Sequence, residues 1–126
     1  MIDKSVITGP DIPKSPLPFS PAIRSGNFLF ISGQGSTDMQ GNIIVDSFEN
    51  ECRRSFENLG KILKTAGLSF DHVVQVRNYV GKQEDLAKFN EIYREYFMSP
   101  FPARTTIMNC LGTILKFEVE AIAIIN

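Results

Sequence analysis

The clearest pattern in the chain is a stripe of apolar residues that recurs every three or four positions between residues 48 and 66. This spacing predicts an amphipathic helix with one buried face. Its start is predicted by Asp46 as the N-cap, with Glu49 completing a capping box, and Gly67 stands in the favoured position just past its end. The stripe consists of Phe48, Cys52, Phe56, Leu59, Leu63 and Ala66.

A second stripe predicts a second helix from about Gln83 to Met98. Asn90 falls on the inward side of this helix, where pattern alone would place an apolar residue. A buried amide needs hydrogen-bonding partners, so Asn90 either braces a loop or points at a ligand. The apolar members of the stripe are Leu86, Phe89, Tyr93 and Phe97.

Runs of β-branched and aromatic residues predict the strands. Two apolar runs flank Ser25-Gly26-Asn27, which predicts a β-hairpin within residues 22–33, and Gly33 and Gly35 allow unusual backbone angles at its end. Before the hairpin, the closely spaced prolines of residues 10–18 exclude a helix and predict an extended surface segment. The other predicted strands cover residues 5–8, 73–80, 103–111 and 116–125.

This order of elements predicts one domain over residues 1–126, of the α+β class, with an antiparallel or mixed sheet and both helices packed on one face. The last predicted strand is apolar on both sides. Ile122 and Ile124 lie on one side, and the other side carries Phe117, Val119, Ala121, Ala123 and Ile125. With two helices able to cover only one face, we expect the second face to be buried against other subunits.

Composition and charge exclude several classes of function. Hydrophobic residues make up 43% and charged residues 21%, with a formal net charge of −1, which is typical of a soluble globular protein without the basic footprint of a nucleic-acid binder. No apolar run is long enough to cross a bilayer, and residues 1–4 lack the apolar stretch of a signal peptide, so we expect a cytoplasmic protein. Cys52, Cys110 and His72 lack metal-ligand spacing, and we interpret both thiols as buried and structural.

Three groups of residues have the chemistry of a site. Arg104 follows Pro102 and shares a strand face with Thr106, so it is either a solvent arginine or a bidentate anchor for a carboxylate or phosphate. Glu118 and Glu120 share a face of the last strand; they form a solvated rim or, if the last two strands pair as a hairpin, one of them lies near Arg104 as a general base. The segment 32–34 either offers backbone N–H groups to a ligand or forms an ordinary turn.

Taken together and in order, these segments resemble the reactive intermediate deaminase family, also called the Rid or YjgF family. The resemblance covers nearly the whole chain. The matching motifs are Pro18-Phe19-Ser20-Pro21-Ala22, Gly26-Asn27, Phe30-Ile31-Ser32-Gly33-Gln34, Ala66-Gly67-Leu68, Phe89-Asn90 with Tyr93, Phe101-Pro102-Ala103-Arg104, and Glu118-Val119-Glu120-Ala121-Ile122-Ala123.

The resemblance implies a chorismate-mutase-like fold and a homotrimer whose sheets form a central barrel, with active sites in clefts between subunits. It implies hydrolysis of small 2-enamino and 2-imino acids to 2-keto acids and ammonia without a cofactor. From the charge, the cysteine and histidine spacing and the short apolar runs, we expect no metal and no nucleic-acid or membrane partner. Two alternatives remain: a non-catalytic protein that binds small carboxylates, and a ribonuclease or translation inhibitor, against which the lack of a basic patch counts.

The resemblance also assigns residues. Arg104 would grip the substrate carboxylate and Glu118 would orient or deprotonate the attacking water. The segment Ser32-Gly33-Gln34 and Asn90 fall on substrate-binding positions. Phe19 and Thr106 also fall on such positions, where the archetypal deaminases have a tyrosine and a cysteine, although the backbone carbonyl of residue 106 can still accept a hydrogen bond from water.

Overall fold

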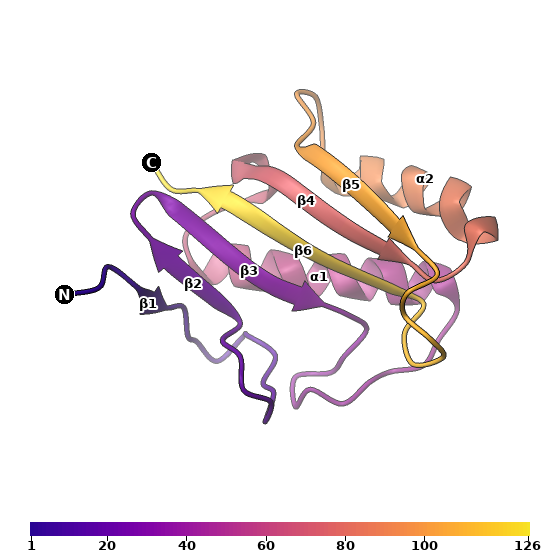
Figure 1. Cartoon of the computed structure of the whole chain (residues 1–126), viewed down its shortest axis with the longest axis horizontal. Coiled ribbons are helices and arrows are strands. Elements are labelled where there is room, and N and C mark those ends of the chain that lie inside the picture. Colours follow the sequence, from indigo (N-terminus) through magenta and orange to yellow (C-terminus); the bar gives the residue numbers. More distant parts are fainter.

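A computed structural model describes all residues from Met1 to Asn126. Six strands form one sheet in the order β1-β2-β3-β6-β4-β5, and α1 and α2 pack on one face of it (Figure 1). Only β4 and β5 run parallel, so the predicted mixed α+β sheet with helices on one face is confirmed. The elements are β1 Ser5–Val6, β2 Ala22–Ser25, β3 Phe28–Gln34, α1 Phe48–Thr65, β4 Val73–Val80, α2 Leu86–Tyr96, β5 Ala103–Met108 and β6 Phe117–Ile124.

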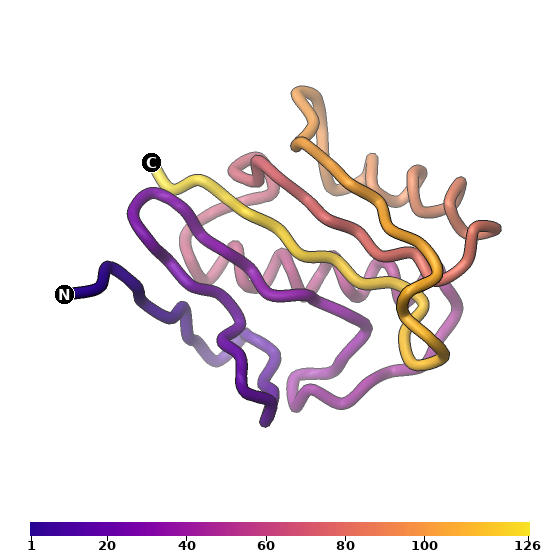
Figure 2. Tube along the Cα trace, in the orientation of Figure 1, coloured from indigo at the N-terminus to yellow at the C-terminus, as the bar shows by residue number.

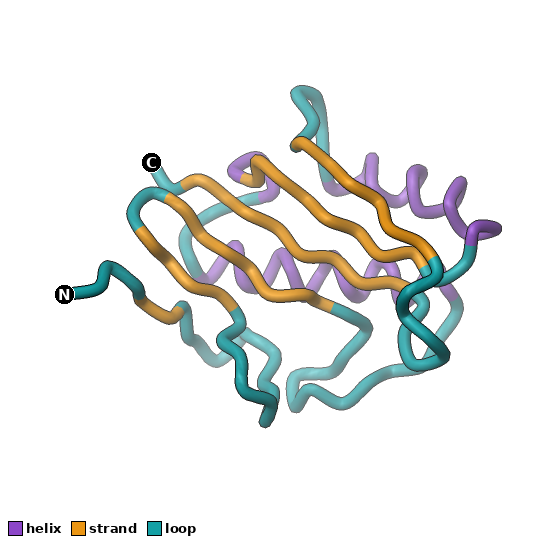
Figure 3. The backbone as a smooth tube through the Cα atoms, in the orientation of Figure 1, coloured by secondary structure: helices purple, strands orange, loops and turns teal.

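The sheet order separates the last two strands. β2 and β3 form the predicted hairpin around Gly26, whose φ of 59° suits the left-handed region that glycine adopts readily. β6 does not pair with β5; it lies between β3 and β4 and pairs with both in antiparallel register (Figure 3). The possible hairpin of the last two strands is therefore wrong, because β4 occupies the position between them.

Helix α1 forms where the apolar stripe predicted it, and only the predicted N-cap residue was wrong. The N-cap is Ser47 rather than Asp46: the Ser47 hydroxyl accepts a hydrogen bond from the Asn50 backbone N–H at 3.2 Å, while the Asp46 carboxylate accepts one from the Ser47 N–H. At the other end, Gly67 has a φ of 77°, and the N–H of Leu68 bonds back to Leu63, which closes the helix in a Schellman motif.

Helix α2 is shorter than predicted. Residues 83–85 form a 3₁₀ turn, the α-helix ends at Tyr96, and Phe97 is already extended at the C-cap. Phe97 is nevertheless buried, because its ring packs edge-on against Phe56 at 5.9 Å. Strand β5 likewise ends at Met108, since Asn109 turns the backbone with a φ of 63°.

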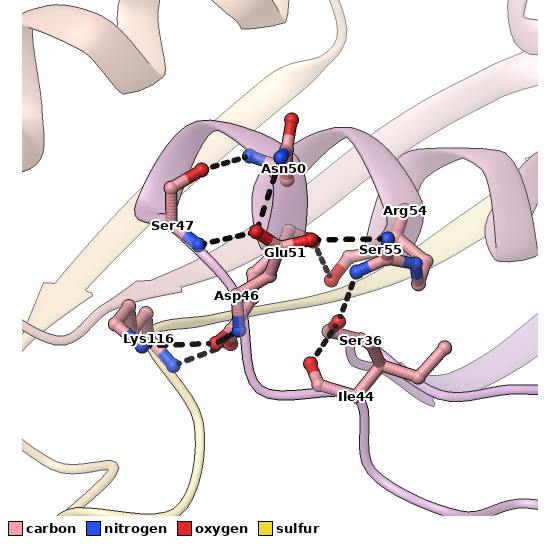
Figure 4. Close-up of polar contacts among 9 residues, drawn as sticks. All are labelled: Ser36, Ile44, Asp46, Ser47, Asn50, Glu51, Arg54, Ser55 and Lys116. Atoms are coloured by element: carbon pink, nitrogen blue, oxygen red, sulfur yellow. Dashed lines mark hydrogen bonds and ion pairs between the residues drawn. The ribbon is translucent and has the colours of Figure 1, made fainter.

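A buried carboxylate joins the start of α1 to the segment that precedes β6 (Figure 4). Glu51 is fully buried and accepts hydrogen bonds from the backbone N–H of Asp46 at 3.0 Å, and from the backbone N–H and the ammonium of Lys116, both at 3.1 Å. The Lys116 ammonium balances its charge. This network fixes the chain immediately before β6 against the first turn of α1.

The face of the sheet opposite the helices carries exposed apolar side chains. Phe28 and Phe30 of β3 are 44% and 45% exposed, and Ile122 and Ile124 of β6 are partly exposed beside them. The buried-thiol prediction holds for Cys52 and is wrong for Cys110, which lies in the exposed turn after β5. Neither helix has the length and apolar character needed to cross a membrane.

Candidate functional site

Arg104 stands on β5, the edge strand, with its side chain on the helix-covered face. Its Cα partner in the parallel register is Val76, a core residue of β4, and paired residues share a face. The guanidinium carbon lies 5.0 Å from the centre of the Phe89 ring and 4.8 Å from that of Tyr93. No carboxylate of the chain pairs with it, so the two rings hold the guanidinium in place while its N–H donors stay free.

A cavity of about 220 Å³ opens beside this guanidinium, and we call it the Arg104 cavity. It contains a second arginine, Arg94, and no acidic residue. Asn90 lies on its wall, partly buried rather than fully inward, and its side-chain amide bonds to no protein group. The Asn90 side chain therefore braces no loop of this chain, and its role toward a ligand stays a prediction. The lining residues are Asn90, Tyr93, Arg94, Phe101, Pro102 and Arg104.

Unsatisfied polar groups lie near Arg104. The buried Thr106 hydroxyl and Tyr93 hydroxyl have no hydrogen-bonding partner in the protein, and neither has the Asn78 amide, which is fully buried. Asn78 and Thr106 are Cα partners on β4 and β5, on the same face as Arg104. Asn78 was not among the predicted site residues. The available signal was an asparagine at a position where strand alternation places the core residues Val76 and Val80.

Glu118 lies on the opposite face of the sheet. Its Cα partner on β4 is Tyr79, which points away from the helices, and its carboxylate makes no hydrogen bond. Burial raises the pKa of the Glu118 carboxyl above its ordinary value, and the neighbouring charge of Glu120 adds to the effect. A Cβ on Gly33 would stand 2.5 Å from the Glu118 Oε2 atom, so a side chain at this position would displace the carboxylate from its present place.

The same geometry corrects one prediction about β3. Neither Gly33 nor Gly35 has a positive φ, so they are not needed for unusual backbone angles. Their lack of a side chain allows close packing instead, because a Cβ on Gly35 would lie 2.9 Å from a methyl group of Leu115.

Glu120 has different surroundings from Glu118, although the two share a strand face. Arg77 donates a hydrogen bond to Glu120 Oε2 at 3.1 Å, and the Tyr79 hydroxyl donates a short one to Oε1. The bond to Glu120 raises the pKa of Tyr79 because it stabilises the protonated phenol. Glu120 is thus held by β4, whereas Glu118 is left free.

A second cavity, of about 530 Å³, adjoins Glu118, and we call it the Glu118 cavity. Its wall includes Phe19, Gly33 and Gln34, three of the predicted substrate-binding residues. Ser32 is not part of the wall, because its hydroxyl donates to the backbone carbonyl of Ser20 at 2.6 Å and ties β3 to the proline-rich segment.

The structure therefore divides the predicted site residues between two cavities. Arg104 and Asn90 line one cavity on the helix-covered face, with Thr106 nearby. Glu118 lies on the opposite face, and Phe19, Gly33 and Gln34 line the cavity beside it. Within one chain Arg104 and Glu118 do not meet. The Arg104 cavity can bind an anion through Arg104 and Arg94. On the other face, the half-buried carboxylate of Glu118 can accept and donate a proton.

Neither side has the ligands of a metal centre. No three His, Cys, Asp or Glu side chains lie close enough together to hold a metal ion. The imidazole of His72 serves a local purpose, since its Nδ1 accepts a hydrogen bond from the Ser69 backbone N–H at 3.1 Å.

Comparison with known proteins places the chain in a family. The family model for endoribonuclease L-PSP matches residues 10–125. A RutC family protein of Pyrococcus horikoshii is 40% identical over 95% of this chain and 97% of its own length. The human 2-iminobutanoate/2-iminopropanoate deaminase is 33% identical over 96% of this chain and 90% of its own. The crystal structure of the Rid family protein YyfA from Yersinia pestis superposes with a TM-score of 0.89 at 30% identity, covering 97% of this chain and 99% of that one. The chain therefore belongs to the Rid/YjgF family, also described as the endoribonuclease L-PSP family.

Proposed function

We propose that this protein is a hydrolytic deaminase of 2-imino and 2-enamino acids, acting at sites assembled between the subunits of a homotrimer. The observation that carries the proposal is the position of Arg104 and Glu118 on opposite faces of one sheet. A substrate that contacts both residues needs them from two different chains. The deaminase names of the human relative and others at similar identity support the reaction class.

In this proposal Arg104 fixes the substrate. Its planar guanidinium, stacked on Phe89 and Tyr93, presents paired N–H donors to the two oxygens of a carboxylate. Arg94 adds positive charge to the same cavity, and the free amide of Asn90 is available to a neighbouring polar atom of the ligand. Fixing the carboxylate places the imine carbon without any covalent step.

Glu118 acts on the water. Its raised pKa brings the carboxyl closer to neutral pH, where a group can both take and return a proton. It accepts a proton as the water oxygen bonds to the imine carbon, and it returns that proton to the nitrogen, which gives a carbinolamine. The carboxylate then takes the hydroxyl proton and passes it to the nitrogen as the C–N bond breaks, so that ammonia leaves and the C=O bond forms. One imine and one water give one 2-keto acid and one ammonia, so no oxidant or reductant is required.

The exposed apolar face supports the assembly. Phe28, Phe30, Ile122 and Ile124 form a patch of the kind that monomeric proteins rarely leave in water. A closed ring of identical subunits would bury this patch in every copy. Light scattering should give three times the chain mass; a stable monomer at micromolar concentration would contradict the assembly.

The activity is tested with imines made in place from amino acids by an amino-acid oxidase, with ammonia release measured above spontaneous hydrolysis. Wild type should accelerate release, and Arg104→Ala and Glu118→Gln should each fall to near the spontaneous rate. If the two variants are unfolded and refolded together in equal amounts, about a quarter of the sites should pair an intact Arg104 with an intact Glu118, and activity should return to that level. No return would mean that each site lies within one chain.

A carboxylate-binding protein without activity is the second candidate. The unpaired guanidinium of Arg104, in a cavity free of acidic residues, favours it equally. Calorimetry with 2-keto acids separates the two functions: binding that is lost in Arg104→Ala, without any acceleration of imine hydrolysis, would identify the binder.

A further inference from the structure

The Glu118 cavity is larger than a small imino acid requires. Its volume of about 530 Å³ lies in the ~300–1,000 Å³ range of pockets that enclose drug-sized ligands. A 2-imino acid of three or four carbons would fill only a small part of it. In the proposed trimer the neighbouring subunit that supplies Arg104 takes part of this volume, and the rest is open to the ligand.

The wall of this cavity is built from three separate segments. The chain before β2 and the loop after β3 lie side by side (Figure 2), where the Lys14 N–H bonds to the Met39 carbonyl at 3.0 Å. The third segment, residues 115–118, leads into β6. The large apolar members of the wall are Ile7, Ile12, Leu17, Phe19, Ile43 and Leu115, and the only charged ones are Lys14 and Glu118.

Close backbone contacts fix this wall. A Cβ on Gly41 would stand 2.1 Å from the Lys14 carbonyl oxygen, so glycine lets the loop after β3 touch the proline-rich segment. Ile12 is almost fully buried and anchors the same segment to the core. The cavity is therefore a built part of the fold beside Glu118, rather than a gap between mobile loops.

We propose that the Glu118 cavity receives the side chain of the substrate, and that the enzyme prefers 2-imino acids with long apolar side chains to those with one or two side-chain carbons. This inference rests on the proposed function, because Glu118 must act at the imine carbon for the side chain to enter here. Burying one methylene contributes about 0.8 kcal/mol, so kcat/KM should rise about four-fold for each methylene that enters.

The experiment uses a straight-chain series. Imines of alanine, 2-aminobutyrate, norvaline and norleucine are generated in place by an amino-acid oxidase, and kcat/KM is measured for each. The expected rise from the three-carbon to the six-carbon imine is about 60-fold. A flat or falling series would overturn the inference while leaving the proposed deaminase intact.

Two matched variants test whether the preference for long side chains depends on the Glu118 cavity. Ile43 is exposed on its loop and lines the cavity, so Ile43→Trp should fold and fill the space, reducing the six-carbon to three-carbon ratio to near one. Ile114→Trp makes the same change at an exposed isoleucine outside the wall and should leave the ratio unchanged. Equal effects of the two variants would contradict the inference.

A result without activity is also decisive. If wild type accelerates no imine, the proposed function fails, and affinity for the 2-keto acids of three to six carbons is measured instead. Affinity should rise about four-fold per methylene in wild type and not in Ile43→Trp. Affinity that is independent of chain length would overturn the inference in that case too.

Discussion

Two buried asparagines should respond in opposite ways to the same substitution. Asn58 is 1% exposed, and its Nδ2 donates to the carbonyls of Gly35 and Thr37 at 3.0 and 3.2 Å. Asn78 is 0% exposed, and neither atom of its amide has a partner in the protein. Leucine has the branching and the heavy-atom count of asparagine and a larger volume, so each replacement removes the amide and adds the same bulk, and the difference between the two variants reports the polar contacts.

The magnitudes follow from these contacts. Asn58→Leu leaves buried carbonyls unpaired and should cost about 1–3 kcal/mol of unfolding free energy. Asn78→Leu removes an unpartnered amide whose burial is unfavourable by a similar amount, so it should be neutral or stabilising by up to about 2 kcal/mol. The two variants should therefore differ by about 1–5 kcal/mol, which corresponds to about 4–20 °C in melting temperature at about 4 °C per kcal/mol for a chain of this size.

The assay is urea and thermal unfolding of both variants and wild type at one protein concentration, because assembly would otherwise shift the apparent stability. If Asn78→Leu proves as destabilising as Asn58→Leu, the reasoning is refuted: the Asn78 amide would then be hydrogen-bonded in solution, and ordered water beside Thr106 would be the first partner to look for.

Other predictions concern the proposed site and its support. Arg104→Lys should lower kcat/KM by roughly 30- to 1000-fold, from about 2–4 kcal/mol, with an unchanged melting temperature, because lysine keeps the charge and loses the planar fork; wild-type turnover would make Arg104 structural. Glu118→Gln should lower turnover, while Glu120→Gln should mainly lower stability by weakening the contact with β4; exchanged phenotypes would refute the assignment. The raised pKa of Glu118 means that its protonated form stabilises the fold, a contribution present below pH 4.5 and lost as pH rises through the folded pKa. Urea midpoints of wild type should therefore improve on acidification relative to Glu118→Gln, and parallel curves would argue against it. Glu51→Ala should cost about 3 kcal/mol by leaving a partly buried ammonium unpaired, and a loss under 1 kcal/mol in urea unfolding would contradict that.

The hydrophobic periodicity of the sequence was sufficient to predict the helices and strands, but it did not predict which strands pair with each other. The stripe of α1 and the strand 73–80 were predicted because burial imposes a period of 3.6 or 2 on the residues themselves. Periodicity says which side of a strand is buried, but not which strand lies beside it. The insertion of β6 between β3 and β4 was therefore not predicted, and the separation of Arg104 from Glu118 follows from that insertion.

The same limit applies to individual site residues. Glu118 and Glu120 are equivalent in the strand pattern. They differ because the register pairs Arg77 with Glu120, and because the Tyr79 side chain, whose Cα partner is Glu118, bonds to Glu120 instead. The N-cap was misplaced by one position because Asp46 and Ser47 are both good capping residues, and the choice depends on which side chain reaches the Asn50 N–H. In both cases the hydrogen-bond partners depend on the three-dimensional structure and cannot be deduced from the residue pattern.

The central place of β6 also determines when the protein can fold during its synthesis. β6 is the last of the six strands in sequence, yet it is the one that joins β1-β2-β3 to β4-β5. At the usual rate of translation, the ribosome needs roughly 2–7 s to add residues 81–116 after β4 is made. Throughout that interval the nascent chain presents two open strand edges, with Phe28 and Phe30 on one of them. A chain truncated before β6 would therefore be an aggregation-prone fragment that binds chaperones, rather than a folded protein of lower stability.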